Sequence, residues 1–328
     1  MRAPLLPVVF RQESFTMLAF LVRRVALAVP TLALVIAITF TLAYYAPGDP
    51  IIALYGQQMP PSPEALAQLR HSYGLDRPYL VQLADYAGNA LRGDFGQSIS
   101  LRRDVAAAME AALPISLQLG AAALLVLLVV GIPLSILAAT HHNSLFDHIA
   151  VGTSVALAAV PTFVVVPVIL LVFVLQLGLF DVPTGWHGLF STQSILPILV
   201  LAIGPLGWFV RTFRAALLEA MSAPHVRTAH AKGLSQRTVL TRHVMRNAIP
   251  TAASAIGLII PWFFVGAFFV ESIFAIPGFG FLSVQALQKF DYPLILGTTI
   301  VAAVIVIASN LVADLVAYAL DPGATLNE

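Results

Sequence analysis

The segment Glu219–Pro250, which reads EAMSAPHVRTAHAKGLSQRTVLTRHVMRNAIP, carries the side chains of this chain that are best suited to binding chemistry. Pro224 suits the first turn of a short helix. Gly233 would end that helix, because glycine adopts a left-handed backbone conformation without strain. Ser235 can then cap a second helix that runs towards Arg246. The sequence therefore predicts a short basic helix, a glycine turn and another helix.

Small and basic residues make the first of these helices suitable for docking. Ala229 and Ala231 keep it thin, so a groove of another protein could approach its backbone, and Arg227 and Lys232 would make charged contacts at the rim. A basic loop that sets membrane topology and attracts anionic lipid is an equally good interpretation of these residues. A DNA-reading helix pair is excluded, because apolar spans on both sides leave it no access to a major groove.

Histidines gather in a second polar segment, where His141, His142, Asp147 and His148 could bind a metal such as zinc or nickel. Their spacing matches no fixed metal motif, so a solvated loop is the better interpretation.

Three polar residues in or beside apolar runs are candidates for an intramembrane function. Asp314 lies near the end of the last run with Asn310 one turn away, and Glu271 falls at the end of the fifth run. An intramembrane carboxylate could be a proton or cation site. The position of both carboxylates near helix ends favours a structural hydrogen bond or a contact with a partner subunit.

The sequence lacks the residue patterns that nucleotide binding and enzymatic catalysis require. The chain has no GxxxxGK[ST] spacing, and Pro277-Gly278-Phe279-Gly280 favours a tight turn over a phosphate-binding loop. The absence of cysteine excludes thiolate metal sites. A membrane enzyme would need carboxylates or histidines clustered at one membrane face, and none is evident. We expect no catalytic residue, no metal and no cofactor in this chain, so any ATP must be bound by another chain.

Composition indicates a membrane protein. Of the 328 residues, 59% are hydrophobic and 10% are charged, against about 25% charged in an ordinary soluble domain. A globular core cannot hide that much apolar surface, so lipid must solvate much of it. The net charge of +1 argues against a nucleic-acid partner.

Long uncharged runs are spaced along the chain. They are Val25–Ala46, Ala111–Thr140, Ile149–Phe180, Gly188–Val210, Asn247–Val270 and Tyr292–Ala313. Each can supply the roughly 20 residues that cross about 30 Å of hydrocarbon as a helix. We therefore expect an all-α polytopic membrane protein with six transmembrane helices and an external helical cap between spans one and two.

Lys and Arg set the expected orientation. Seven of the 17 basic residues lie between Arg211 and Arg246, whereas the loop around Asp181 and His187 has none. The positive-inside rule therefore places the basic loop and, with six spans, both termini in the cytoplasm.

The expected organisation follows from these spans. Residues 1–24 form a cytoplasmic segment, residues 25–322 the six-span domain and residues 323–328 a cytoplasmic tail. Within the domain, residues 47–110 form the external cap and residues 211–248 the cytoplasmic loop. In the cap, we expect Ser62 to cap one helix and a second helix to run from about Tyr79 to Leu91. The first run is too long for a typical signal peptide, and both Met1 and Met17 stay open as the start.

The basic loop resembles the signature loop of ABC-importer permeases of the dipeptide, oligopeptide and nickel family, which reads close to YVRTARAKGLS and then RNALIP. Here residues 225–235 read HVRTAHAKGLS and residues 246–250 read RNAIP. Further matching blocks, in order, are Arg23-Arg24 with Pro47-Gly48-Asp49-Pro50, Gly93-Asp94-Phe95-Gly96, Glu271-Ser272-Ile273-Phe274 with Pro277-Gly278-Phe279-Gly280, Asp291-Tyr292-Pro293, and Asn310 to Asp314 with Leu320-Asp321-Pro322. The resemblance extends from about Met17 to Pro322 and is to the first of two paired permease subunits.

The resemblance implies that the loop helices are coupling helices, seated in a groove of a cytoplasmic ATPase subunit. The residues carried over as contact or shape residues are His225, Arg227, Thr228, Ala229, Lys232 and Gly233. His225 and His230 stand where tyrosine and arginine are usual in the family, which puts the strength of docking in question.

The resemblance also implies partners and a substrate class. The partners are a second homologous permease, two cytoplasmic ATPase subunits that bind ATP and Mg²⁺, and an external solute-binding protein, all at the bacterial inner membrane. Short peptides are the expected cargo, with nickel, glutathione-like peptides and glycans as alternatives. An ion-coupled secondary transporter is the remaining alternative, in which Asp314 or Glu271 would be essential.

Overall fold

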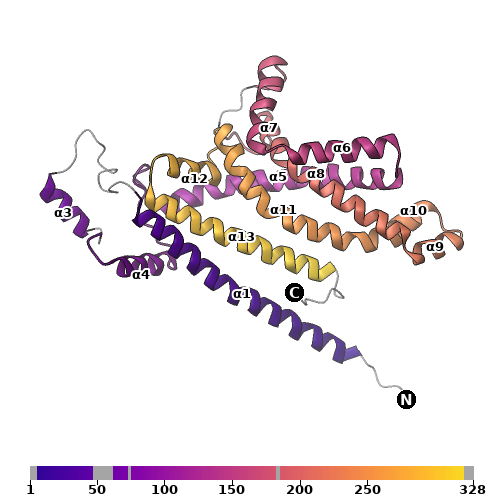
Figure 1. Ribbon diagram of the computed structural model, residues 1–328, viewed down its shortest axis with the longest axis horizontal. Helices are drawn as coiled ribbons and strands as arrows, with labels where there is room; N and C mark the ends of the chain where they lie inside the picture. The colour runs from indigo at the N-terminus through magenta and orange to yellow at the C-terminus, as the bar shows by residue number, and fades with distance from the viewer. Residues whose placement is uncertain (1–5, 47–61, 73–74, 182–184, 321–328) are drawn as a thin grey trace.

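The computed structural model describes residues 6–46, 62–72, 75–181 and 185–320, and its long helices form an elongated bundle (Figure 1). These residues contain no β-strand, so the predicted all-α fold is confirmed. The elements are α1 (Leu6–Tyr44), α3 (Pro63–Ser72), α4 (Tyr79–Ala90), α5 (Val105–Thr140), α6 (Leu145–Ala159), α7 (Thr162–Ile169), the π-helical η1 (Leu170–Gln176), α8 (Thr192–Ser222), α9 (Pro224–Ala231), α10 (Gln236–Val239), the π-helical η2 (Leu240–Val244), α11 (Met245–Ile273), α12 (Phe279–Gln288) and α13 (Tyr292–Leu320).

The bundle has two distinct ends. Helices α5, α6, α8, α11 and α13 pack side by side, and α1 lies along α13. Helices α3, α4 and α12 lie at one end, called here the cap end, and α9 and α10 lie at the other, called the loop end (Figure 1). Within the described residues five helices are long and apolar enough to cross a membrane, and the bent pair of α6 and α7–η1 supplies a sixth crossing if it counts as one span.

The third span differs from the expected continuous helix. The helices Leu145–Ala159 and Thr162–Gln176 are bent by 104° at the break between them, and α7 projects from the bundle (Figure 1). Val160 and Pro161 both have extended backbones, with ψ angles of 121° and 141°. Proline clashes with a helical conformation of the residue before it, which gives the physical reason for the break.

Small residues allow the long helices to pack closely. A Cβ atom at Gly207 of α8 would lie 2.4 Å from the backbone oxygen of Ser154 in α6, and one at Gly257 of α11 would lie 2.4 Å from Cβ of Ala313 in α13. Real Cβ atoms do not approach so closely. Glycine is therefore required for the observed spacing of both helix pairs, as is common between membrane helices.

A buried carboxylate organises the cap end. Glu271 is 0% exposed, and its Oε1 accepts a hydrogen bond of 2.5 Å from Ser116 Oγ of α5. Its Oε2 accepts a bond of 3.1 Å from the backbone N–H of Phe281 in the first turn of α12. Ser116 Oγ in turn accepts a bond of 2.7 Å from the N–H of Phe279. Glu271 and Ser116 thus satisfy N–H groups that a helix start leaves without partners.

The expected tight turn is present, since the N–H of Gly278 donates to the carbonyl oxygen of Ile276 at 2.7 Å, and the glycines beside this carboxylate also provide space. Gly278 is the N-cap of α12 and has a φ of −90°, which other residues also adopt. A Cβ atom at Gly278 would lie 2.5 Å from the Glu271 carboxylate, and one at Gly280 would lie 2.7 Å from the Phe268 backbone. The Pro-Gly-Phe-Gly block therefore brings α12 onto Glu271.

A second carboxylate joins the cap end to α13. Asp291 is 0% exposed, and its Oδ2 accepts hydrogen bonds from Ser98 Oγ at 2.5 Å, Ser100 Oγ at 2.8 Å and the Ser100 N–H at 2.8 Å. Its Oδ1 accepts a weaker bond of 3.3 Å from the N–H of Leu294 in the first turn of α13. The segment before α5 is thereby tied to the start of the last helix.

Aromatic side chains attach α4 to α1. The Phe40 ring centroid lies 5.8 Å from that of Tyr79 and 5.7 Å from that of Tyr86, and Thr41 Oγ1 lies 2.7 Å from the Tyr79 hydroxyl. Burial raises the pKa of the Tyr86 hydroxyl. The expected cap of α3 is present, since Ser62 Oγ accepts a hydrogen bond of 3.3 Å from the Ala65 N–H. The Pro47–Pro50 segment lies outside the described residues.

We expect Glu271→Ala to destabilise the protein, because it leaves buried donors of Ser116 and α12 unsatisfied at about 1–3 kcal/mol each. The unfolding temperature of the detergent-solubilised variant should fall by several degrees. Glu110→Ala, which removes an exposed carboxylate from α5, is the matched control and should leave the temperature unchanged. Equal unfolding temperatures for both variants would contradict the assigned role of Glu271.

Candidate functional site

The loop end has the predicted helix, glycine turn and helix. Ala223 caps α9 with an extended backbone, and Pro224 occupies its first turn without losing a hydrogen bond. Gly233 follows the helix with a φ of +75°, as its left-handed conformation requires. Its N–H donates to the carbonyl of His230 at 2.9 Å, and the N–H of Leu234 donates to that of Ala229 at 3.4 Å. These two bonds satisfy carbonyls that the helix end leaves free.

The second helix begins at the expected cap. Ser235 Oγ accepts a hydrogen bond of 3.3 Å from the N–H of Thr238. The chain then passes through α10 and the π-helical turn η2 into α11, so that Gln236–Ile273 is one helical rod of 38 residues. A π-helical turn holds one residue more than an α-turn at this point.

One face of α9 is buried against the bundle. Val226 is 3% exposed and Ala229 is 4% exposed, and both belong to the hydrophobic core cluster that includes Leu217 of α8, Val239 of α10 and Val244 of η2. Ala229 therefore shapes the contact between α9 and its own bundle. Our expectation that Ala229 opens the outer face of α9 to a partner is wrong, whereas Ala231 does lie on the exposed side.

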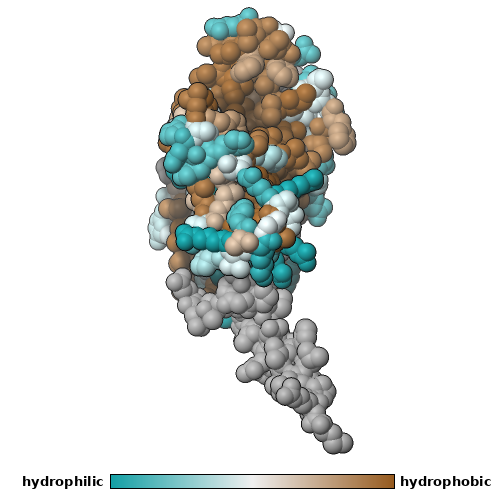
Figure 2. Space-filling model, turned by 90° about the vertical axis from the view of Figure 1, so that its right-hand side faces the viewer, coloured by the Kyte–Doolittle hydropathy of each residue, from teal (hydrophilic) through white to brown (hydrophobic). Residues whose placement is uncertain are grey.

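The other face of the loop is exposed and basic. His225, Arg227, Thr228, Lys232 and Gly233 are all exposed. Figure 2, which looks at the loop end, shows hydrophilic side chains gathered across the middle of this face. Exposed basic side chains of the loop and the adjoining helix ends are Arg211, Arg227, Lys232, Arg237, Arg242 and Arg246. Within the described part of the chain, neither Arg227 nor Lys232 has an acidic partner.

A hydrogen bond ties the first turn of α9 to α11. The Asn247 side-chain amide donates to Nε2 of His225 at 2.8 Å and to the carbonyl oxygen of His243 at 3.1 Å. Because an amide nitrogen can only donate, Nε2 of His225 is the acceptor in this bond. The imidazole thus holds the loop together in addition to being exposed.

The segment with histidines contains an ion pair that the sequence did not suggest. Asp147 was expected in a solvated loop, but its side chain is only 3% exposed. Arg214 of α8 contacts it twice, through Nε to Oδ1 at 2.5 Å and through Nη2 to Oδ2 at 2.6 Å. The N–H of Asn143 donates to Oδ2 at 2.9 Å, and Nδ1 of His142 lies 3.4 Å from the same oxygen. This is a bidentate, charge-assisted contact between α6 and α8.

The other histidines of this segment contact their own helices. His141 Nδ1 lies 3.0 Å from the carbonyl oxygen of Leu137, and His148 Nδ1 lies 2.7 Å from that of Ser144. Among the described residues, no group of three or more His, Asp or Glu side chains is arranged to hold a metal ion.

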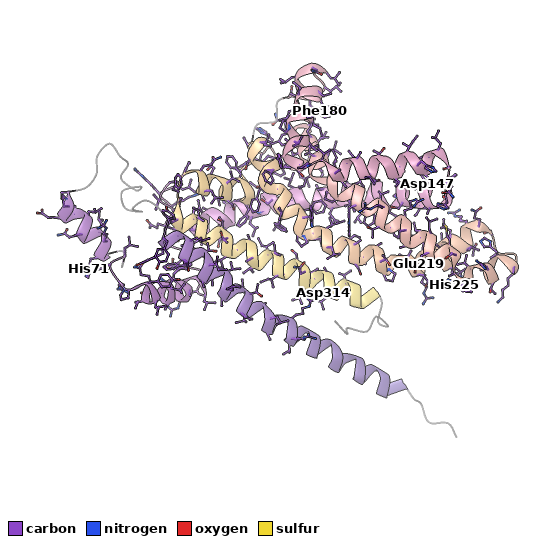
Figure 3. All side chains as sticks on the ribbon, in the orientation of Figure 1. His71, Asp147, Phe180, Glu219, His225 and Asp314 are labelled. Atoms are coloured by element: carbon purple, nitrogen blue, oxygen red, sulfur yellow. The ribbon has the colours of Figure 1, made fainter. Side chains whose placement is uncertain are left out.

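The three intramembrane candidates do not form one site. Asp314 Oδ2 lies 2.9 Å from Arg24 Nη2, which joins α13 to α1, while Asn310 is exposed one turn earlier. Figure 3 shows Asp314 towards the loop end, on the same side of the bundle centre as Glu219 and His225. Glu271 lies at the cap end with α12. The carboxylates are thus in separate structural contacts.

The arrangement at the loop end supports binding and not catalysis. An exposed basic surface is carried by two short helices, and their inner faces pack on the ends of α8 and α11. Binding at this surface would act directly on two long helices of the bundle.

Comparisons with known proteins match nearly the whole chain. The family described as binding-protein-dependent transport system inner membrane component matches residues 131–326, and the N-terminal family of this membrane component matches residues 17–120. The dipeptide transport system permease protein of Lactococcus lactis subsp. cremoris is 34% identical over 94% of this chain and 100% of its own length. The oligopeptide transport system permease protein of Haemophilus influenzae is 32% identical, covering 93% of this chain and 99% of its own. The dipeptide permease protein of Escherichia coli is 32% identical, covering 93% and 98%.

We expect Ala229→Leu to destabilise the loop end, because three added carbons overpack a buried contact at about 1–3 kcal/mol. Ala231→Leu, two residues along on the exposed side, should cost no more than about 0.5 kcal/mol. Limited proteolysis within residues 223–246 of the two purified variants measures the difference. Equal cleavage rates would show that α9 does not pack on the bundle through Ala229.

Proposed function

Because the chain belongs to the family of binding-protein-dependent transport system inner membrane components, we propose that it forms the membrane path of an ATP-driven importer of short peptides. A member of this family is a permease subunit, a transport component and not an enzyme. The observation that carries the peptide assignment is the similarity to relatives named for dipeptide and oligopeptide transport, over 93–94% of this chain.

The proposed system contains further subunits. A second, homologous permease would complete the path, two cytoplasmic ATPase subunits would bind ATP and Mg²⁺, and an external solute-binding protein would deliver the peptide. The lack of a GxxxxGK[ST] segment in the sequence is consistent with ATP binding on other chains. The exposed surface of α1 supports a partner or lipid beside it, since Phe40 is the only buried side chain in Val22–Tyr44.

The loop end is the proposed docking site for an ATPase subunit. The exposed side chains of His225, Arg227, Thr228 and Lys232 would contact a groove of the ATPase, and Gly233 would set the direction of the turn. The exposed cations Arg227 and Lys232, which have no acidic partner in the described part of the chain, favour an acidic groove. Ala229 packs α9 against the bundle, and because it is buried it would set the shape of the loop in this proposal without contacting the ATPase.

The proposed orientation follows from the docking site. The loop end and both termini would face the cytoplasm, and the cap end with α3, α4 and α12 would face outwards to the solute-binding protein. The concentration of Lys and Arg at the loop end supports this orientation.

The carboxylates of the bundle support an ATP-driven system over an ion-coupled carrier. A proton-carrying carboxylate needs a path to water and freedom to change partners. Glu271 is instead fully buried against Ser116 and α12, and Asp314 faces the guanidinium of Arg24. Both contacts are suited to holding helices together.

Purification of the chain from its native membrane in mild detergent tests the assignment directly. We expect a second six-span protein and P-loop ATPases to accompany it, and ATP-dependent uptake of a radiolabelled dipeptide after reconstitution. Uptake of Ni²⁺ without uptake of the dipeptide would show that the metal ion is the substrate. Recovery of the chain alone, with ion-driven transport, would overturn the proposal.

A substitution at Gly233 tests the docking site. Gly233→Val forces a β-branched residue into a left-handed conformation, at a cost of about 1–2 kcal/mol, while no atom of the described residues lies within 4 Å of a Cβ at this position. We expect the variant to stay in the membrane, but less of the ATPase subunit should co-purify with it and peptide transport should be slower. Gly233→Asn, which tolerates this conformation, is the matched control. An unchanged transport rate for Gly233→Val would exclude the glycine turn from docking.

A further inference from the structure

The ion pair between Asp147 and Arg214 occupies a position that joins two parts of the fold. Arg214 lies in α8, two helical turns before that helix ends at Ser222, and α9 of the loop follows after a single residue. Asp147 lies in the first turn of α6, the helix that leads to the break at Pro161 and to α7. The pair thus connects α8, which leads into the loop, with α6, which leads into the projecting helix α7.

A second contact between the same helices has different physical properties. Two turns along α6, the backbone oxygen of Ser154 lies against Gly207, two turns back along α8. Glycine offers no side chain that could interlock with α6, so this contact brings the helices close but resists sliding weakly. The guanidinium of Arg214 is a rigid fork with two fixed hydrogen bonds to one carboxylate, which does resist sliding.

The surroundings of Asp147 keep its carboxylate in place. Ser144 Oγ accepts the N–H of Asp147 and so fixes the start of α6. Asn143 has a φ of +61°, and its N–H donates to Oδ2 of Asp147. His142 lies within 3.4 Å of that oxygen and accepts a hydrogen bond of 3.1 Å from Arg214 Nη2. The short turn between α5 and α6 is therefore built around this ion pair.

We propose that Asp147 and Arg214 are positioning residues that oblige α6 and α7 to follow α8 when the docked loop moves. Movement of α9 reaches α8 through the buried contact of Val226 and Ala229 with the core that includes Leu217. The ion pair then passes axial movement of α8 to α6, which the smooth contact at Gly207 does not do. This inference rests on the proposed function, because it requires an ATPase at the loop.

The first measurement compares transport with ATP hydrolysis in the complete reconstituted system. Asp147→Asn keeps the shape of the side chain but removes its charge, and we expect the number of peptides transported per ATP to fall about tenfold or more, a typical size for coupling between sites. Basal ATP hydrolysis should stay within about twofold of the unaltered complex. Glu219→Gln, which removes an exposed carboxylate from the same helix α8, is the matched control and should leave the ratio unchanged.

A second variant separates positioning from stability. Asp147→Asn leaves the partly buried Arg214 guanidinium without its counter-ion, which also destabilises the fold. The double variant Asp147→Asn/Arg214→Gln removes that stranded charge and should regain thermal stability while the transport-to-ATP ratio stays low. Recovery of the ratio together with stability would overturn the proposal, because the pair would then serve the fold alone.

The outcomes distinguish this inference from the assignment beneath it. Failure of the unaltered chain to assemble with ATPases or to transport with ATP would overturn the proposed function. An assembled Asp147→Asn complex with an unchanged ratio would overturn the positioning role and leave the proposed function standing. Parallel loss of hydrolysis and transport at an unchanged ratio would also overturn the positioning role.

Discussion

Polar groups inside hydrocarbon must find hydrogen-bond partners within the protein. At the Glu271 carboxylate this constraint determines how α5, α11 and α12 are joined. One side chain of α11 accepts hydrogen bonds from α5 and from the start of α12, and so closes the cap end with no water required. The block Pro277-Gly278-Phe279-Gly280 follows from it, because larger residues would separate α12 from the carboxylate. Asp291 repeats the same solution at the start of α13.

The loop end is organised in the opposite sense. Its short helices bury Val226 and Ala229 on the bundle and expose Arg227 and Lys232 on the other side, where neither has an acidic partner among the described residues. In the adjacent ion pair the Asp147 side chain is 3% exposed and that of Arg214 is 17% exposed. Exposed charge that is free to bind thus lies beside enclosed charge that fixes helix positions, and both are connected by α8.

Features with a local cause could be predicted from the sequence. The spans follow from uncharged runs, and the helix, glycine turn and Ser235 cap follow from the backbone preferences of those residues. The burial of Ala229 and Asp147 could not be predicted, because it depends on which faces of distant helices meet, and no periodicity identifies Arg214 as the partner of Asp147. The break in the third span had a local signal in Pro161. Proline occurs in several membrane helices of this chain without such a bend, as at Pro133 and Pro205, so that signal alone was not decisive.

The π-helical turn η2 makes the connection between loop and membrane depend on the number of residues. If Leu240–Val244 were wound as an α-helix with all its residues kept, everything before it would rotate by about 100° relative to α11. Val239, which is 2% exposed, would then leave the core and a polar neighbour would replace it. Removal of one residue from this segment would instead let an α-helical turn keep both flanking faces where they are, because the π-turn holds one residue more. The wider turn therefore determines which side of α10 meets the bundle.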